Sequence, residues 1–249
     1  MSTALVHYSA AAATDRGRKR PSNEDAFAYS VEHGVYLVCD GMGGAAAGEI
    51  ASSLAVDETL KHLSRRIASG VEPENLAQVA EEAISIANEA IYKRAERNYK
   101  LSGMGTTLVG LIVHEHQILV LNVGDSRCYL LRNSKIQQLT IDHSLVEEQV
   151  RLGRMTRSEA LRSPLKNVIT RALGTQSRVT PDVFEREAEP GDLFLLCSDG
   201  LTRELSDSQI ESLLRSDLTL AVLCSKLVGA AMNAGGHDNI TCLLVRVDG

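Results

Sequence analysis

Between residues 106 and 139 the chain contains a succession of strand-like runs with very short connections, and this block constrains the fold more than any other feature. The runs are rich in β-forming side chains and cover residues 106–113, 118–123, 127–132 and 135–139. Strands joined by so few residues pair antiparallel, because a parallel pair needs a crossover of about a dozen residues or more. The block therefore predicts an antiparallel sheet.

Helical periodicity flanks this block on both sides. Apolar residues recur every three or four positions through residues 45–67 and 73–99, and Pro73 suits a first helical turn. Shorter helices are expected at 145–152, 158–161, 206–214 and 220–233, and further strands at 10–13, 34–39, 181–187, 193–197 and 240–247. Since strands and helices occur in blocks, we expect an α+β fold with helices outside antiparallel sheets, not a doubly wound parallel fold.

Composition narrows the functional class. The 249 residues are 44% hydrophobic, which is enough to fill a core, and no repeat or linker divides residues 1–249, so we expect a single domain. The 26 basic and 32 acidic residues give a formal net charge of -6, which argues against a general nucleic-acid binder. No apolar run approaches the ~18 residues of a membrane span, so none is expected.

Cysteine usage and the N-terminus indicate a cytoplasmic protein. The cysteines are odd in number and form no C-x-x-C motif, which favours buried thiols over disulfides. They are Cys39, Cys128, Cys197, Cys224 and Cys242. The first residues have neither the basic start nor the apolar stretch of a secretory signal.

Acidic residues stand at the ends of several expected strands, most of them beside glycine. They are Asp40, Asp125, Asp199, Asp238 and the pair Glu24 and Asp25. Any one of them is well explained as a helix cap or turn residue. Together they indicate a shared site, because buried strands bring their ends to one edge, where gathered carboxylates repel and are costly to desolvate. Oxygen ligands without His or Cys favour Mg²⁺ or Mn²⁺ over Zn²⁺ as the neutralising ion.

Seven short motifs occur in order along nearly the whole chain. They are T-D-R-G-R-K-R-P-S-N-E-D from Thr14, V-C-D-G-M-G-G from Val38, S-G-M-G-T-T from Ser102, N-V-G-D-S-R from Asn122, I-T-R-A-L-G from Ile169, L-C-S-D-G-L-T from Leu196 and G-G-H-D-N-I-T from Gly235. In this combination the chain resembles the metal-dependent serine/threonine protein phosphatases of the type 2C family, in its bacterial form. The resemblance implies a four-layer αββα sandwich, with two antiparallel sheets face to face and helices flanking each.

The resemblance also implies roles for the acidic residues. Asp40 matches the carboxylate that bridges two metal ions, and the Gly41 carbonyl matches a further ligand. Asp199 and Asp238 match ligands of the first ion. The implied cofactor is therefore a pair of Mn²⁺ or Mg²⁺ ions.

The second ion and the substrate phosphate have their own matches. Glu24 and Asp25 correspond to the acidic pair that serves the second ion, directly or through water. Arg20 corresponds to the arginine that grips the phosphate, with a planar fork that can meet two oxygens at once. On this resemblance a hydroxide shared by the two ions attacks the phosphorus of phosphoserine or phosphothreonine, and no catalytic cysteine is needed.

The partners implied by the resemblance are phosphoserine and phosphothreonine proteins, including a bacterial serine/threonine kinase whose action the enzyme reverses. A monomer is expected. Two alternatives keep the same fold: a catalytically weak regulatory protein, and a phosphatase that acts on an anti-sigma-antagonist type of regulator. The presence of Arg20, Asp40, Asp199 and Asp238 weighs against a non-catalytic protein.

Two positions depart from the family pattern. Met42 stands where animal members carry a histidine proposed as general acid, so the acid that protonates the leaving group is unassigned. Arg203 stands where many bacterial members carry an aspartate that, together with the counterpart of Asp125, holds a third metal ion. Asp125 is therefore a candidate ligand, and a third ion is left open.

Residues 142–166 resemble the flap that lies beside the active site in this family. Its arginines are suited to attract phosphorylated or acidic segments, although a solvated polar loop is the simpler explanation. They are Arg151, Arg154, Arg157 and Arg162.

Three other patterns have competing explanations. G-M-G-G-A-A from Gly41 fits a dinucleotide-binding turn, but a second helix rather than a second parallel strand is expected to follow. His114-Glu115-His116 fits a metal pair or, more simply, an exposed hairpin turn. His143 fits either proton transfer or a hydrogen-bonding role.

Overall fold

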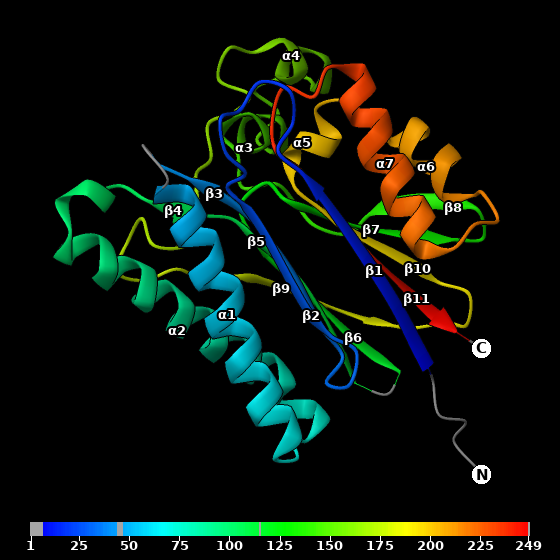
Figure 1. Ribbon diagram of the computed structural model, residues 1–249, viewed down its shortest axis with the longest axis horizontal. Helices are drawn as coiled ribbons and strands as arrows, with labels where there is room; N and C mark the ends of the chain where they lie inside the picture. Colours follow the sequence, from blue (N-terminus) through cyan, green and yellow to red (C-terminus); the bar gives the residue numbers. More distant parts are fainter. Residues whose placement is uncertain (1–6, 44–46, 115, 249) are drawn as a thin grey trace.

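Two antiparallel sheets lie at the centre of the computed structural model, which describes residues 7–43, 47–114 and 116–248 (Figure 1). The first sheet has the order β1 (His7–Asp15), β11 (Ile240–Asp248), β10 (Leu193–Cys197), β7 (Arg127–Arg132) and β8 (Lys135–Gln138). The second has the order β2 (Asp25–Ser30), β3 (Val35–Met42), β5 (Leu108–His114), β6 (Gln117–Val123) and β9 (Asp182–Glu187), with the short β4 (Gly105–Thr106) paired to β3. All these pairs are antiparallel, as the short connections predicted.

Two pairs of helices cover the outer faces of the sheets. α1 (Ala47–Ala68) and α2 (Leu76–Arg97) pack against each other, and α1 lies on β2 and β3. α6 (Asp207–Leu214) and α7 (Leu220–Ala234) lie over the first sheet, on the opposite side of the molecule (Figure 1). The expected α+β class and the four-layer αββα sandwich are therefore confirmed.

The side chains of strand β3 pack into two different hydrophobic clusters, one on each face of its sheet. Successive side chains of a strand point to opposite faces. Val35, Leu37 and Cys39 accordingly pack with α1 and α2, whereas Tyr36 and Val38 pack between the two sheets. Because both faces are buried, the strand is apolar throughout rather than alternating.

Short helices complete the fold. They are η1 (Pro73–Asn75), η2 (Tyr99–Leu101), α3 (Leu145–Arg151), α4 (Arg157–Arg162) and α5 (Asp199–Thr202). Helices α3 and α4 lie within the 142–166 segment, at the same end of the strands as α5 (Figure 1). Helix α4 begins with a capping box, in which Thr156 and Glu159 each accept a hydrogen bond from the other's backbone N–H.

The structure corrects the expected bounds of the strand at 34–39. Strand β3 continues to Met42, so Asp40 and Gly41 lie inside a strand rather than in the turn after it. The reason is that β4 offers a partner, with Gly41 opposite Thr106. The expected 106–113 run is in turn divided at Thr107, which donates its N–H to the Asp40 carbonyl oxygen (2.9 Å) and accepts the Asp40 N–H on Oγ1 (2.9 Å).

Other bounds also differ from expectation. Strand β2 was not predicted, and the expected edge at 10–13 is the middle of the nine-residue β1. The expected helix at 73–99 is divided into η1, α2 and η2. The expected helix at 45–67 corresponds to α1, and residues 45 and 46 lie outside the described ranges.

The dinucleotide-binding alternative does not fit this topology. That motif needs a parallel βαβ unit, whereas β3 pairs antiparallel with both β2 and β5. Residues 44–46 of the pattern lie outside the described residues. Among the helices that the structure describes, none has the length and apolar character required to cross a bilayer.

Candidate metal centre

The acids predicted at strand ends meet at one end of the two sheets. β10 ends and β11 begins opposite one another, so Asp199, two residues beyond β10, lies near Asp238, two residues before β11. In the other sheet, Asp25 opens β2 directly opposite Asp40 of β3. Sheet register therefore gathers residues that are far apart in the sequence.

Asp25 connects the two sheets. Its carboxylate oxygen Oδ2 accepts hydrogen bonds from the hydroxyls of Ser198 and Thr241, both at 2.7 Å. Burial raises the pKa of Asp25 to about 6, although the two hydroxyls act in the opposite direction. Keeping this carboxyl group ionised in the folded protein therefore costs free energy of folding.

Asp40 lies at the centre of the acidic residues. Burial raises its pKa well above the usual range, and the charges of Asp25, Asp199, Asp125 and, more weakly, Asp238 raise it further. Such mutual repulsion in a dry environment is costly unless positive charge compensates it.

Among the residues that the structure describes, three carboxylate oxygens at this place have no hydrogen-bond donor. They are the buried Oδ1 atoms of Asp25, Asp125 and Asp199. An unpaired buried acceptor costs about 1–3 kcal/mol, and more when it is charged. A divalent cation that prefers oxygen ligands would satisfy these atoms, so the residues present fit Mg²⁺ or Mn²⁺.

Glu24 and Gly41 are held together by tight backbone packing. The Glu24 carbonyl oxygen accepts the Gly41 N–H (3.1 Å) and the Ser52 hydroxyl (2.6 Å). A Cβ atom on Gly41 would overlap the Gly48 carbonyl oxygen of α1, so glycine is required there. Burial raises the pKa of Glu24, with Arg20 opposing the shift. Glu24 therefore belongs to the same charged cluster.

Two arginines supply positive charge to the cluster. Arg20 Nη2 donates to Asp238 Oδ2 at 2.7 Å, and Arg203 Nη1 donates to the same oxygen at 2.8 Å. The other end of the Arg203 guanidinium forms an ion pair with Asp199 Oδ2. About half of the Arg20 side chain is exposed, which leaves it accessible to a solute anion.

These ion pairs affect how the acids are arranged. Across residues 7–43, 47–114 and 116–248, no three His, Cys, Asp or Glu side chains already surround one point as a metal cage. Asp199 and Asp238 instead form ion pairs with Arg203. The argument for a cation at this place therefore rests on the unpaired Oδ1 atoms.

Asp125 is positioned through His143. The Gly124 N–H donates to Nδ1 of His143 (3.0 Å), so Nε2 carries the proton that is shared with Asp182 (3.1 Å). Arg171 donates to the other oxygen of Asp182 (2.6 Å). Burial lowers the pKa of His143. Both ring nitrogens take part in hydrogen bonds, which fits the hydrogen-bonding interpretation of this residue.

Several polar residues of the site were not singled out from the sequence. Asn239 accepts the Glu24 N–H (2.8 Å) and donates to the carbonyl oxygens of Arg16 (2.7 Å) and Ser22 (2.9 Å), which fixes the β1–β2 loop against β11. Like Thr107, Ser198 and Thr241, Asn239 lies inside one of the seven motifs, and both Asn239 and Ser198 directly adjoin an aspartate. Membership of a motif was the available signal.

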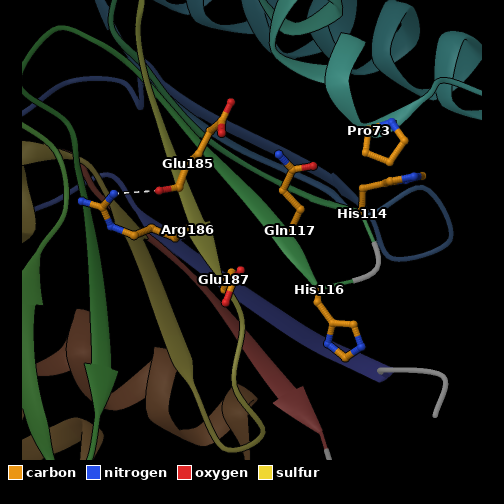
Figure 2. Close-up of a pocket in the computed structure, with 7 residues that line it drawn as sticks. All are labelled: Pro73, His114, His116, Gln117, Glu185, Arg186 and Glu187. Atoms are coloured by element: carbon orange, nitrogen blue, oxygen red, sulfur yellow. Dashed lines mark hydrogen bonds between the residues drawn. The ribbon is translucent and has the colours of Figure 1, made fainter. Parts of the chain in front are cut away.

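The pocket shown in Figure 2 is separate from this cluster. It is lined by Pro73, His114, His116, Gln117, Glu185, Arg186 and Glu187. It lies where β6 begins, whereas Asp125 follows the end of β6, roughly 20 Å away at about 3.3 Å per residue. Figure 2 shows the rings of His114 and His116 well apart, which fits a hairpin rather than a metal pair.

Comparison with known proteins supports the same interpretation. A family model described as "Protein phosphatase 2C" matches residues 14–231. The serine/threonine phosphatase stp of Listeria monocytogenes is 40% identical over 238 residues, which cover 94% of each chain.

Solved structures agree with the sequence comparison. The serine/threonine phosphatase PstP/Ppp of Mycobacterium tuberculosis matches with a TM-score of 0.90 and 36% identity, over 98% of this chain and all of that one. A structure of the catalytic domain of PstP in complex with two manganese ions matches with a TM-score of 0.88 and 36% identity, over 99% of this chain and all of that one.

Proposed function

Since the chain belongs to the protein phosphatase 2C family and is a serine/threonine phosphatase, we propose that it hydrolyses phosphoserine and phosphothreonine esters at the acidic cluster around Asp40. The observation that carries this proposal is the set of buried carboxylates with unpaired oxygens beside an accessible arginine. Phosphate ester hydrolysis needs positive charge beside the transferred phosphoryl group and a positioned nucleophile. Divalent ions held by these carboxylates, together with Arg20, would provide both.

The cofactor is a pair of Mn²⁺ or Mg²⁺ ions. Asp40 would serve both ions and the Gly41 carbonyl would be a further ligand, with Asp199 and Asp238 on the first ion. Glu24 and Asp25 would serve the second. The two manganese ions bound to the related PstP domain support this number. When bound, such ions supply a shared hydroxide near neutral pH and neutralise the phosphate.

The chain's own residues then orient the ester. Arg20 stands beside Asp238 with its fork partly in solvent, so it is placed to receive two phosphate oxygens. Ser198 and Thr241 keep Asp25 in one orientation, and Asn239 fixes the backbone of Glu24.

The partners follow from this chemistry. We propose phosphoproteins as substrates, including a serine/threonine kinase, and a cytoplasmic monomer with one domain over residues 1–249. The exposed arginines of 142–166 suit an acidic substrate segment next to the site. They are Arg151, Arg154, Arg157 and Arg162.

Phosphate release from matched peptides tests this function. We expect hydrolysis of a phosphothreonine peptide with Mn²⁺ or Mg²⁺, little hydrolysis of the phosphotyrosine version, and loss of activity in excess EDTA that added Mn²⁺ restores. Full activity after chelation and metal-free dialysis would contradict the proposal.

Replacing Arg20 tests phosphate recognition separately. Arg20→Lys keeps the positive charge but loses the planar fork, and we expect kcat/KM for the phosphothreonine peptide to fall by roughly tenfold or more, mainly through KM. Arg18→Lys, in the same loop, is the matched control. Equal kinetics for both variants would remove Arg20 from the proposed role.

A further inference from the structure

Arg203 lies inside the acidic cluster because of its place in the chain. It follows α5 by one residue, and its N–H donates to the Asp199 carbonyl oxygen at 2.8 Å. Residues four apart on a helical turn lie on one face. The guanidinium therefore reaches back to the carboxylate of Asp199.

The contacts of Arg203 engage two carboxylates at once. Nη2 pairs with Asp199 Oδ2, and Nη1 donates to Asp238 Oδ2 at 2.8 Å. Both acids are mostly shielded, with side chains 9% and 16% exposed, and the Arg203 side chain is 31% exposed. Its positive charge also acts on Asp125. The guanidinium thus neutralises one side of the cluster.

These two carboxylates are those assigned above to the first metal ion. A divalent cation on Asp199 and Asp238 would compete with the guanidinium for the same oxygens, and at such short range the two positive charges would repel. Asp238 Oδ2 already accepts from Arg20 as well, which adds to the competition.

We propose that Arg203 is a built-in cation that competes with the divalent ion for Asp199 and Asp238 and so sets the metal affinity of this centre. The inference rests on the proposed function. On this proposal Arg203 is a positioning residue. Its guanidinium holds the carboxylates of Asp199 and Asp238 in place without the ion and is displaced when the ion binds.

Calorimetric titration of chelator-stripped protein with Mn²⁺ tests the proposal without measuring activity. Arg203→Gln removes the competing charge, and we expect its tightest Mn²⁺ site to bind about tenfold more strongly than in the unmodified chain. Arg215→Gln is the matched control, because Arg215 is an exposed arginine that pairs with Glu211, four residues earlier in the chain, and lies outside the acidic cluster. Its affinity should equal that of the unmodified chain.

Thermal unfolding gives an independent readout. Without Mn²⁺, Arg203→Gln should melt at a lower temperature than Arg215→Gln, since Asp199 and Asp238 lose their partner. Saturating Mn²⁺ should then raise its melting temperature by more than in the unmodified chain. If Arg203→Gln does not yield folded protein, Arg203→Lys, which cannot span both acids, should tighten Mn²⁺ binding by a smaller factor.

Unchanged or weaker Mn²⁺ binding in the Arg203 variants would overturn this inference. The proposed function has a separate readout: if the unmodified chain neither binds Mn²⁺ nor hydrolyses the phosphothreonine peptide, that function fails. An unmodified chain that does both, with an Arg203→Gln variant of equal affinity, leaves the function intact and removes only the role of Arg203.

Discussion

Asp40→Asn is expected to lower phosphatase activity on the order of 10³-fold while making the chelated protein more stable. Activity falls because Asp40 is the carboxylate assigned to both ions, and loss of transition-state charge stabilisation has effects of this size. Stability rises because the loss of solvent around Asp40, and then the charges of Asp25, Asp199 and Asp125, oppose its ionisation.

The stability gain is expected to be roughly 1–2 kcal/mol, as is common when a strained functional group is removed. Urea unfolding after chelation measures it, and phosphate release from a phosphothreonine peptide in Mn²⁺ measures activity. Asp217→Asn removes an exposed carboxylate from a loop between α6 and α7 and serves as the control. Retained activity, or destabilisation without metal, would show that Asp40 is not the centre of a repulsive cluster.

The chelated protein is also expected to lose stability as pH rises from about 4 to above 6. Burial raises the pKa of both Asp25 and Asp125 from 3.8 to about 6. Between these values the folded protein binds more protons than the unfolded chain, so removing protons favours unfolding. A shift of about two pKa units corresponds to about 3 kcal/mol for each group.

Urea unfolding across this pH range measures the effect, in protein dialysed free of divalent ions. Asp25→Asn should flatten the profile, because the amide does not titrate yet its oxygen can still accept from Ser198 and Thr241. With Mn²⁺ present the slope should reverse, since metal ligands must be deprotonated. A chelated protein whose stability rises over this window would contradict the proposed burial of unpaired acids.

The fold could be predicted well from local patterns, with errors that have clear causes. Short connections between apolar runs were sufficient to predict antiparallel sheets. Strand β2 was missed because its six residues are mostly half-buried and lack a strong apolar run. Asp40 was expected in a turn because D-G is a turn signal, but pairing of Gly41 with Thr106 extends β3 through it.

For the candidate site, the sequence identified the residues but not all of their contacts. The motifs identified Arg20, Asp40, Asp199 and Asp238, because the residue types and their neighbours are visible in the sequence. They did not show that Arg203 bridges two of these acids, since that contact depends on where a side chain goes after packing.

By itself, the sequence determined that the strands pair antiparallel and that Asp199 and Asp238 flank two of them, because both follow from spacing and side-chain periodicity along the chain. Only the tertiary structure decided that Asp25 faces Asp40 across β2 and β3, and that Arg20 reaches Asp238, 218 positions away. The physical reason is that such contacts depend on sheet register and on the pairing of charged side chains that are shielded from water. Both are fixed only when the two sheets pack against each other.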